Sequence, residues 1–232
     1  MRIQILLAIV ILLMSICYMP SAYCDKINLI DANKIIDDLK SEIKKNPKDI
    51  APRIDLGATY FQLQEYALAK QQFIGVLAID SNNTMAIYNL GKTLLVMGST
   101  DEGIAKCEKA IELGFNDINV YQTLAHAYFN KNELKKSLKM YEAIKRLTPN
   151  DDRVYFACGL LYIELKDGWK AREEFKKAVE LNPNNAEAHY ELGWLYADYE
   201  PDYARQELEA TLKLNPDHQG AKKELKRLSD KQ

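Results

Sequence analysis

One string in this sequence has the residue types of a phosphate-binding loop. Residues 86–93 read Ala-Ile-Tyr-Asn-Leu-Gly-Lys-Thr, with Gly91, Lys92 and Thr93 in the order of the nucleotide-binding motif and Ala86 in place of its first glycine. That motif works as a glycine-rich turn between a strand and a helix, where backbone N–H groups surround the phosphates. Here the same residues lie inside a helical pattern, so we predict no nucleotide site.

The histidines and cysteines give no pattern of catalysis or metal binding. His126, His189 and His218 are far apart in the sequence, and none of the four cysteines forms a Cys-x-x-Cys pair or a Cys/His cluster. Cys107 and Cys158 fall at positions where a core residue is expected, and a buried thiol acts there as a small hydrophobe. We therefore predict a protein without catalytic residues, metal or cofactor, and not an enzyme.

The charge balance argues against nucleic acid as a partner. The 232 residues include 31 Lys and Arg against 33 Asp and Glu, a net charge of -2. A general nucleic-acid binder needs an extended positive field. The one dense basic run, in residues 222–227, ends a helical stretch, where cations offset the negative end of the helix dipole.

Residues 1–24 read as a targeting segment. Arg2 precedes a largely apolar run, and small residues Ala22 and Cys24 would suit cleavage before Asp25. We expect an exported protein, periplasmic or secreted. An uncleaved anchor at residues 3–19 and a lipoprotein remain alternatives, although a bulky residue precedes both Cys17 and Cys24.

A period of 34 residues dominates the rest of the chain. Small residues recur at this spacing, at Gly57, Gly91, Ala125, Gly159 and Gly193. A second small residue follows twelve positions later, or eleven in the last copy, at Ala69, Gly103, Ser137, Ala171 and Ala204. Apolar residues at spacings of three, four and seven around them indicate helices, and turn dipeptides such as Asn182-Pro183 end each unit. Each unit is thus a helical hairpin.

This pattern resembles the tetratricopeptide repeat, with its Leu-Gly-x-x-Tyr, Ala, Phe and Pro signature. The resemblance implies an all-α fold, a right-handed superhelical solenoid of antiparallel helix pairs. We expect five repeats, at residues 50–83, 84–117, 118–151, 152–185 and 186–216. Capping helices would flank them, in residues 25–49 and 217–232.

The small residues indicate close helix crossings, with Gly57 facing Ala69 and Gly159 facing Ala171. Bulk at Gly159 should overpack such a crossing. The second repeat departs most from the pattern, because it has Gly103 and Cys107 where Ala and an aromatic residue are usual and lacks the closing proline. We expect it to be the least stable hairpin.

In the family that this sequence resembles, the first helix of each hairpin lines a concave groove. Carried over to this sequence, the groove positions are aromatic, apolar or polar in type. They are Phe61, Tyr88, Lys92, Leu95, Gln122, His126, Phe129, Arg153, Phe156, Leu160, Tyr190 and Trp194. An exposed apolar patch of this kind marks a binding surface. The alternative is that some of these side chains pack against one another or beneath a terminal segment.

The resemblance implies a non-catalytic scaffold that binds a peptide or protein segment. Basic and amide residues that hold an acidic C-terminal tail in chaperone-binding members are replaced here by apolar residues or Gln, so that partner is not expected. The competing hypothesis is a structural protein that self-associates, or an envelope-assembly lipoprotein, with no free groove. The sequence does not fix the oligomeric state.

Overall fold

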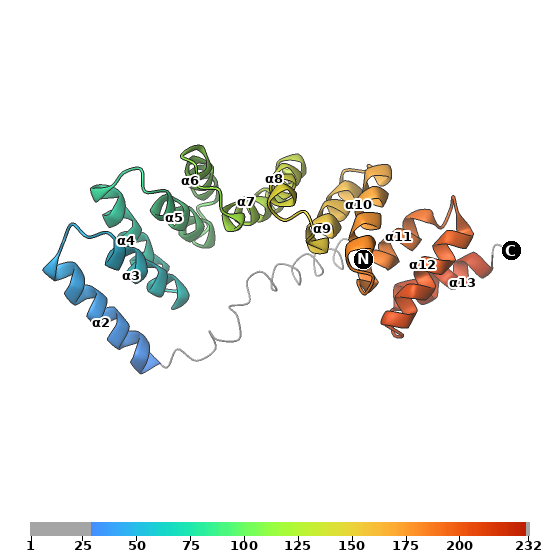
Figure 1. Cartoon of the computed structure of the whole chain (residues 1–232), viewed down its shortest axis with the longest axis horizontal. Coiled ribbons are helices and arrows are strands. Elements are labelled where there is room, and N and C mark those ends of the chain that lie inside the picture. The colour runs from blue at the N-terminus through green and yellow to red at the C-terminus, as the bar shows by residue number, and fades with distance from the viewer. Residues whose placement is uncertain (1–28, 231–232) are drawn as a thin grey trace. The chain divides into compact units, whose positions relative to one another are not determined.

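The computed structural model describes residues 29–230, and within that range every regular element is an α-helix (Figure 1). The helices are α2 (Leu29–Lys45), α3 (Ala51–Gln62), α4 (Tyr66–Ile79), α5 (Thr84–Val96), α6 (Thr100–Glu112), α7 (Ile118–Asn130), α8 (Leu134–Leu147), α9 (Asp152–Glu164), α10 (Gly168–Leu181), α11 (Ala186–Tyr196), α12 (Pro201–Leu214) and α13 (Gln219–Ser229). None of them combines the length and apolar character that a membrane span requires. The predicted leader, residues 1–24, lies outside the described range.

The chain divides into two compact units. Helices α2 to α7 belong to the first, which ends at Lys131, and α8 to α13 belong to the second. Within each unit, helices that follow one another in sequence pack together, most extensively in the pairs α3–α4, α5–α6, α9–α10 and α11–α12. Helix α2 packs on α3, and α13 packs on α12. The predicted all-helical fold of consecutive helix pairs with flanking helices is confirmed.

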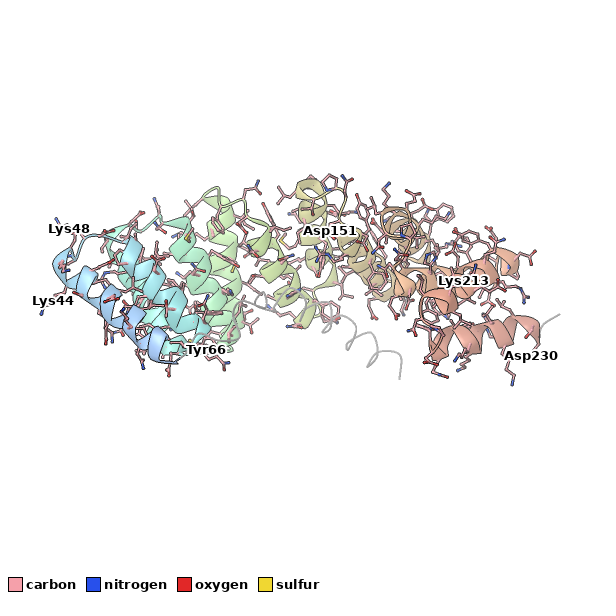
Figure 2. All side chains as sticks on the ribbon, turned by 60° about the horizontal axis from the view of Figure 1, so that its bottom comes forward. Lys44, Lys48, Tyr66, Asp151, Lys213 and Asp230 are labelled. Atoms are coloured by element: carbon pink, nitrogen blue, oxygen red, sulfur yellow. The ribbon has the colours of Figure 1, made fainter. Side chains whose placement is uncertain are left out.

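Two kinds of turn alternate along the chain: one joins the two helices of a hairpin, and the other joins one hairpin to the next. In the first unit, Lys48 marks the turn that leads into α3, and Tyr66, at the start of α4, lies at the opposite edge (Figure 2). The turn inside each of the first four hairpins contains a residue in the left-handed region. These residues are Gln64, Gly98, Asn132 and Lys166, with φ of 62°, 85°, 60° and 61°. Only at Gly98 is this conformation free of Cβ strain. The fifth hairpin is one residue shorter, and among the described residues of its turn none has a positive φ.

Side-chain caps begin the first helices of the later hairpins at the same 34-residue spacing. The caps are Asn83, Asp117, Asp151 and Asn185, and each side chain accepts a hydrogen bond from a backbone N–H two or three residues on. Such a cap satisfies one of the unpaired N–H groups of a helix start, for about 1 kcal/mol. It also fixes where each helix begins, and therefore which side chains point to a given face.

Large apolar side chains fill the space between the helices of the first unit. Phe73 is 1% exposed and packs with Leu56, Tyr60, Leu90 and Leu94. Ile36 of α2 joins the same cluster, with Leu39 and Ile43 packed against it. The α2 helix is therefore attached through one apolar stripe, and the residues of 33–45 outside that stripe are exposed, with Ile35 among them at 43%.

The recurrent glycines lie where two helices cross closely, but the partner of two of them differs from the expected one. A Cβ on Gly57 would lie 2.6 Å from the Phe73 ring, and one on Gly159 would lie 2.5 Å from the Phe175 ring. The predicted partners, Ala69 and Ala171, are buried at 0% exposure, but the rings four residues later fill the space. The glycine is thus needed to accommodate an aromatic ring.

In the second hairpin, the glycine at the crossing faces the backbone of the partner helix instead of an aromatic ring. A Cβ on Gly91 would lie 2.9 Å from the carbonyl oxygen of Gly103, and one on Gly103 would lie 2.8 Å from that of Gly91. Cys107 stands where Phe73 and Phe175 stand in their hairpins, with its Sγ 2.7 Å from the same Gly91 position. The departures from the repeat pattern in this hairpin therefore compensate one another, because smaller side chains let the helices approach. That it is the least stable hairpin stays a prediction.

We predict that Gly159→Ala destabilises the second unit by about 1–3 kcal/mol, the usual cost of an added methyl group in a packed core. The buried Phe175 ring has no exposed space to move into. Gly168→Ala is the matched control, because its Cβ would meet only Leu195, at 3.9 Å. Urea unfolding followed by circular dichroism measures both. Equal midpoints for the two variants would show that the crossing tolerates the methyl group.

Candidate functional site

In the first unit, the predicted groove residues lie on α3, α5 and α7, the first helices of their hairpins. Helix α3 contacts α5, and α5 contacts α7. Their side chains therefore share one face, which we call the first-helix face and define by Phe61, Tyr88, Lys92, Leu95, Gln122, His126 and Phe129.

Lys92 and Phe61 link α5 to α3 on this face. The Lys92 Nζ lies 4.4 Å from the centroid of the Phe61 ring, a cation–π distance. The Phe61 ring meets Tyr66 edge to face at 5.3 Å between centroids. Burial lowers the pKa of the Lys92 amine below its ordinary value of 10.5. A cation that has lost part of its hydration shell interacts more strongly with an acceptor brought to it.

Tyr88 links α5 to α7 and is only 8% exposed. Its ring stacks on Phe115 at 5.3 Å between centroids, and its hydroxyl lies 3.3 Å from the Thr123 Oγ1. Because the Thr123 hydroxyl donates to the carbonyl oxygen of Asn119, the Tyr88 hydroxyl acts as the donor. The predicted binding residue Tyr88 thus holds two first helices together and offers little surface.

The remaining residues of this face are partly exposed. Leu95, Gln122, His126 and Phe129 all keep some accessible surface. Burial lowers the pKa of His126 below its ordinary value of 6.5. At neutral pH its ring is therefore uncharged, with one nitrogen a donor and the other an acceptor.

In the second unit, two of the predicted binding residues belong to the core. Phe156 and Leu160 are 2% and 3% exposed, and the Phe156 ring packs against Phe175 at 5.5 Å between centroids. The expectation of an exposed apolar patch at these two positions is therefore corrected. Burial of such side chains is favourable by about 1.5–3 kcal/mol each, which explains why the fold encloses them.

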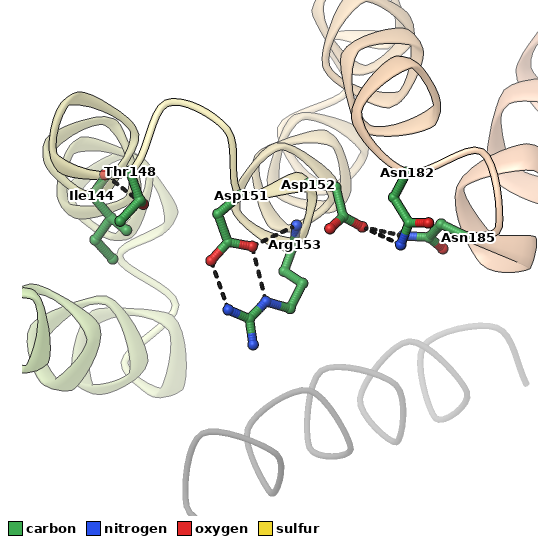
Figure 3. A network of polar contacts seen from close by, with 7 residues as sticks. All are labelled: Ile144, Thr148, Asp151, Asp152, Arg153, Asn182 and Asn185. Atoms are coloured by element: carbon green, nitrogen blue, oxygen red, sulfur yellow. Dashed lines mark hydrogen bonds and ion pairs between the residues drawn. The ribbon is translucent and has the colours of Figure 1, made fainter.

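Arg153 is exposed and held by its neighbour Asp151 (Figure 3). Its Nε and Nη2 each donate to a carboxylate oxygen of Asp151 at 2.8 Å, and the hydrogen bond from Arg153 lowers the pKa of that carboxyl. The adjacent Asp152 accepts from the side-chain amides of Asn182 and Asn185, both at 3.1 Å. This network ties the start of α9 to the turn before α11.

Tyr190 lies beneath the C-terminal helix and Trp194 is partly exposed on α11. The Tyr190 ring is 4.4 Å from the His218 ring, and a Cβ on Gly220 would lie 2.7 Å from the Tyr190 Cζ. His218 also caps α13 by accepting from the backbone N–H of Ala221 at 3.0 Å. The packing of groove positions beneath a terminal segment, which we weighed as an alternative, therefore applies to Tyr190.

The two buried cysteines are not poised for chemistry. Burial raises the pKa of both the Cys107 and the Cys158 thiol to about 12. Both are therefore protonated at neutral pH, whereas a nucleophilic cysteine needs the thiolate.

Sequence reasoning missed a separate group of residues, Trp169, Arg172, Tyr196 and Tyr199. Trp169 and Tyr199 are 66% and 76% exposed. They lie outside the groove positions of the repeat pattern, in two consecutive hairpins, and only the fold brings their side chains together. The available signal was a tryptophan outside the core and groove positions of the repeat, followed three residues later by Arg172.

Comparisons with known proteins agree with this architecture. A tetratricopeptide repeat model matches residues 118–151, and a TPR repeat model matches residues 170–198. The tetratricopeptide repeat domain-containing protein PYG7 of Arabidopsis thaliana, a chloroplastic protein, is 26% identical over 118 residues. This match covers 49% of the present chain and 39% of PYG7, so it spans less than half the length of that relative.

Solved structures share the fold. YrrB, described as a TPR protein with an unusual peptide-binding site, superposes with a TM-score of 0.69 at 24% identity, covering 81% of this chain and 97% of that one. The MamA protein gives 0.63 at 22% identity, with coverage of 72% and 92%. The C-terminal part of a TPR repeat-containing protein from Cytophaga hutchinsonii gives 0.69 at 20%, with coverage of 87% and 81%.

We predict that the second unit becomes less stable as pH rises above neutrality because of His189. Its Nδ1 lies 2.6 Å from Glu207 Oε2 and its Nε2 lies 3.0 Å from the carbonyl oxygen of Pro183. Only the imidazolium can donate to both, and the hydrogen bond with Glu207 raises the pKa of His189 above its ordinary 6.5. This stabilisation is complete below the unfolded pKa and is lost as pH rises through the folded pKa.

The test is the free energy of unfolding from pH 6 to pH 9, measured for wild type and for His189→Gln. The variant should be less stable by about 1–3 kcal/mol at pH 6, the range for a hydrogen bond to a charged group. The difference should shrink at high pH. A difference independent of pH would show that His189 is neutral throughout.

Proposed function

Because this chain is a tetratricopeptide repeat protein, its fold supports protein–protein interaction, and we propose that it is a non-catalytic scaffold that binds a peptide or protein segment. The proposed site in the first unit is the first-helix face. The observation that carries the proposal is the connection of α3, α5 and α7 through Lys92 on Phe61 and Tyr88 on Thr123. These contacts make a continuous, ordered surface from three hairpins.

The chemistry of this face favours a segment with apolar anchors and a hydrogen-bond acceptor. Leu95 and Phe129 offer apolar surface, and the partly desolvated Lys92 amine would bind a carboxylate or backbone carbonyl of the ligand. Gln122 and His126 add uncharged donors and acceptors. YrrB, described as having a peptide-binding site, shares the fold, and we carry over from it only the class of ligand, a peptide.

The structure narrows the proposed site in the second unit. Phe156 and Leu160 are core residues and Tyr190 packs beneath α13, so Arg153 and Trp194 are the candidates for contact there. Truncating Tyr190 would disturb the packing of α13 as well as any binding. Binding is therefore better tested on the first unit.

We propose further that the protein is exported and works in an envelope or secretory compartment. This rests on the sequence of residues 1–24, with its basic start, apolar run and small residues before Asp25. Mass spectrometry of the chain purified from its native host should give a mature N-terminus at Asp25. A mass that includes the leader or a lipid would replace cleavage with one of the two membrane-attached alternatives.

The binding proposal is tested by placing a photo-cross-linking amino acid at Leu95 or at Gln122 in the native host. Both positions should give an adduct with the same partner protein. Ile74 on α4, which is 48% exposed, provides the matched control on a second helix and should give no such adduct. Lys92→Glu should reduce the adduct about tenfold, equivalent to about 1.4 kcal/mol of binding free energy.

Two outcomes would contradict the proposal. Equal yields of the same adduct from Ile74 would place contact elsewhere on the hairpins. An adduct of the chain with itself alone would support the self-associating structural protein instead.

A further inference from the structure

In the second unit, an aromatic cluster with two exposed rings joins α10, the end of α11 and the turn after α11. Trp169 is the second residue of α10, and Tyr199 lies in the turn between α11 and α12. Their side chains are 66% and 76% exposed. Exposing this much aromatic surface to water is unfavourable. Tryptophan and tyrosine are also enriched among the residues that contribute most of the binding energy at protein interfaces.

Arg172 holds these rings together. Its Cζ lies 5.1 Å from the centroid of Trp169, 5.2 Å from that of Tyr196 and 5.5 Å from that of Tyr199. Three rings around one guanidinium restrict the rotation of the arginine side chain. We call these four residues, Trp169, Arg172, Tyr196 and Tyr199, the aromatic platform.

The guanidinium of Arg172 lacks the partner that its chemistry calls for. Its Nε is buried and has no hydrogen-bond acceptor, and no carboxylate of residues 29–230 forms an ion pair with it. The neighbouring cations differ in this respect, because Lys170 pairs with Asp167 at 3.2 Å and Lys176 pairs with Glu173 at 3.7 Å. A buried N–H without an acceptor costs about 1–3 kcal/mol.

A ligand carboxylate would pair with the guanidinium through its terminal nitrogens, because the Nε itself is enclosed. Arginine presents a planar set of donors that matches a carboxylate. Because the three rings already restrict the Arg172 side chain, little side-chain entropy remains to be lost on binding. A flat apolar side chain next to that carboxylate would cover Trp169 and Tyr199. The charge and the exposed rings together therefore select an acidic residue beside an aromatic residue or proline.

The surrounding charges favour a protein segment over a nucleic acid. Two cations lie at the platform, Arg172 and Lys176, and Lys176, 5.3 Å from the Tyr196 centroid, is already paired with Glu173, whereas a strand of phosphates requires several uncommitted cations. Glu200 and Asp202 are exposed beside Tyr199 and would repel a polyanion. A single carboxylate placed on Arg172 meets much less of this repulsion.

We propose that the aromatic platform is a second docking surface, which binds an acidic segment of a partner protein. The carboxylate of an Asp or Glu sits on Arg172, and an adjacent aromatic or proline side chain lies on Trp169 and Tyr199. This surface works independently of the first-helix face, so one chain can hold two partner segments.

The test is selection of a random 12-residue peptide library on the full-length chain, with counter-selection on Arg172→Gln. Recovered peptides should share an Asp or Glu next to Trp, Phe, Tyr or Pro. By fluorescence anisotropy, Arg172→Gln, Trp169→Ala and the Asp→Asn version of the peptide should each weaken binding at least about tenfold. Arg172→Lys should fall short of wild type, because lysine lacks the planar donor set.

Leu214→Ala at the end of α12 is the matched control, because it removes a 39% exposed apolar side chain that belongs neither to the platform nor to the groove positions, and it should leave peptide binding unchanged. Circular dichroism checks that each variant folds, and the exposure of Trp169 makes its truncation mild. Three results would overturn the proposal: peptides that bind Arg172→Gln as tightly as wild type, self-association that Trp169→Ala abolishes, or platform-dependent binding of a single-stranded oligonucleotide in place of acidic peptides.

Discussion

The structure depends on one close helix crossing in each hairpin that lies within one unit, namely α3–α4, α5–α6, α9–α10 and α11–α12. At this crossing a glycine or other small residue of the first helix leaves room for a bulky side chain, or for the backbone, of the second. The distances from an added Cβ, 2.5 Å to Phe175 at Gly159 and 2.6 Å to Phe73 at Gly57, show how little space remains. Because the two helices can meet closely only there, the crossing fixes the register of the hairpin, and the chain returns to it every 34 residues.

The proposed functions follow from this register. When each hairpin is fixed in the same way, α3, α5 and α7 lie side by side and turn corresponding positions to one face. Lys92, placed over Phe61, combines a charge with apolar surface that a single hairpin could not provide. The turns between helices do not take part in these crossings, so their side chains are less constrained. Trp169 and Tyr199 lie in or beside such turns, where exposed side chains do not disturb the core.

The sequence predicted the period, the helices and the positions of the small residues, because these follow from local spacing and from the geometry of helix packing. It did not predict which side chain fills each crossing. Ala69 and Ala171 are the small residues of the pattern, but a ring four residues later reaches further across the helix axis. Nor could spacing separate a partly exposed aromatic position from an enclosed one: Phe156 and Tyr190 lie 34 residues apart at the same place in the repeat, yet Phe156 is 2% exposed and Tyr190 is partly exposed. The aromatic platform joins residues of two hairpins, which no periodicity brings together.

The central claim, that a small residue opposite a bulky one sets each hairpin, is tested most directly by a double-mutant cycle at Gly159 and Phe175. Phe175→Leu should open space, so that Gly159→Ala costs at least about 1 kcal/mol less in that background than in wild type, well beyond the scatter of independent sites. Urea unfolding of the four chains gives this coupling. Costs that add within about 0.5 kcal/mol would mean that the two positions do not share one crossing, and would contradict the account.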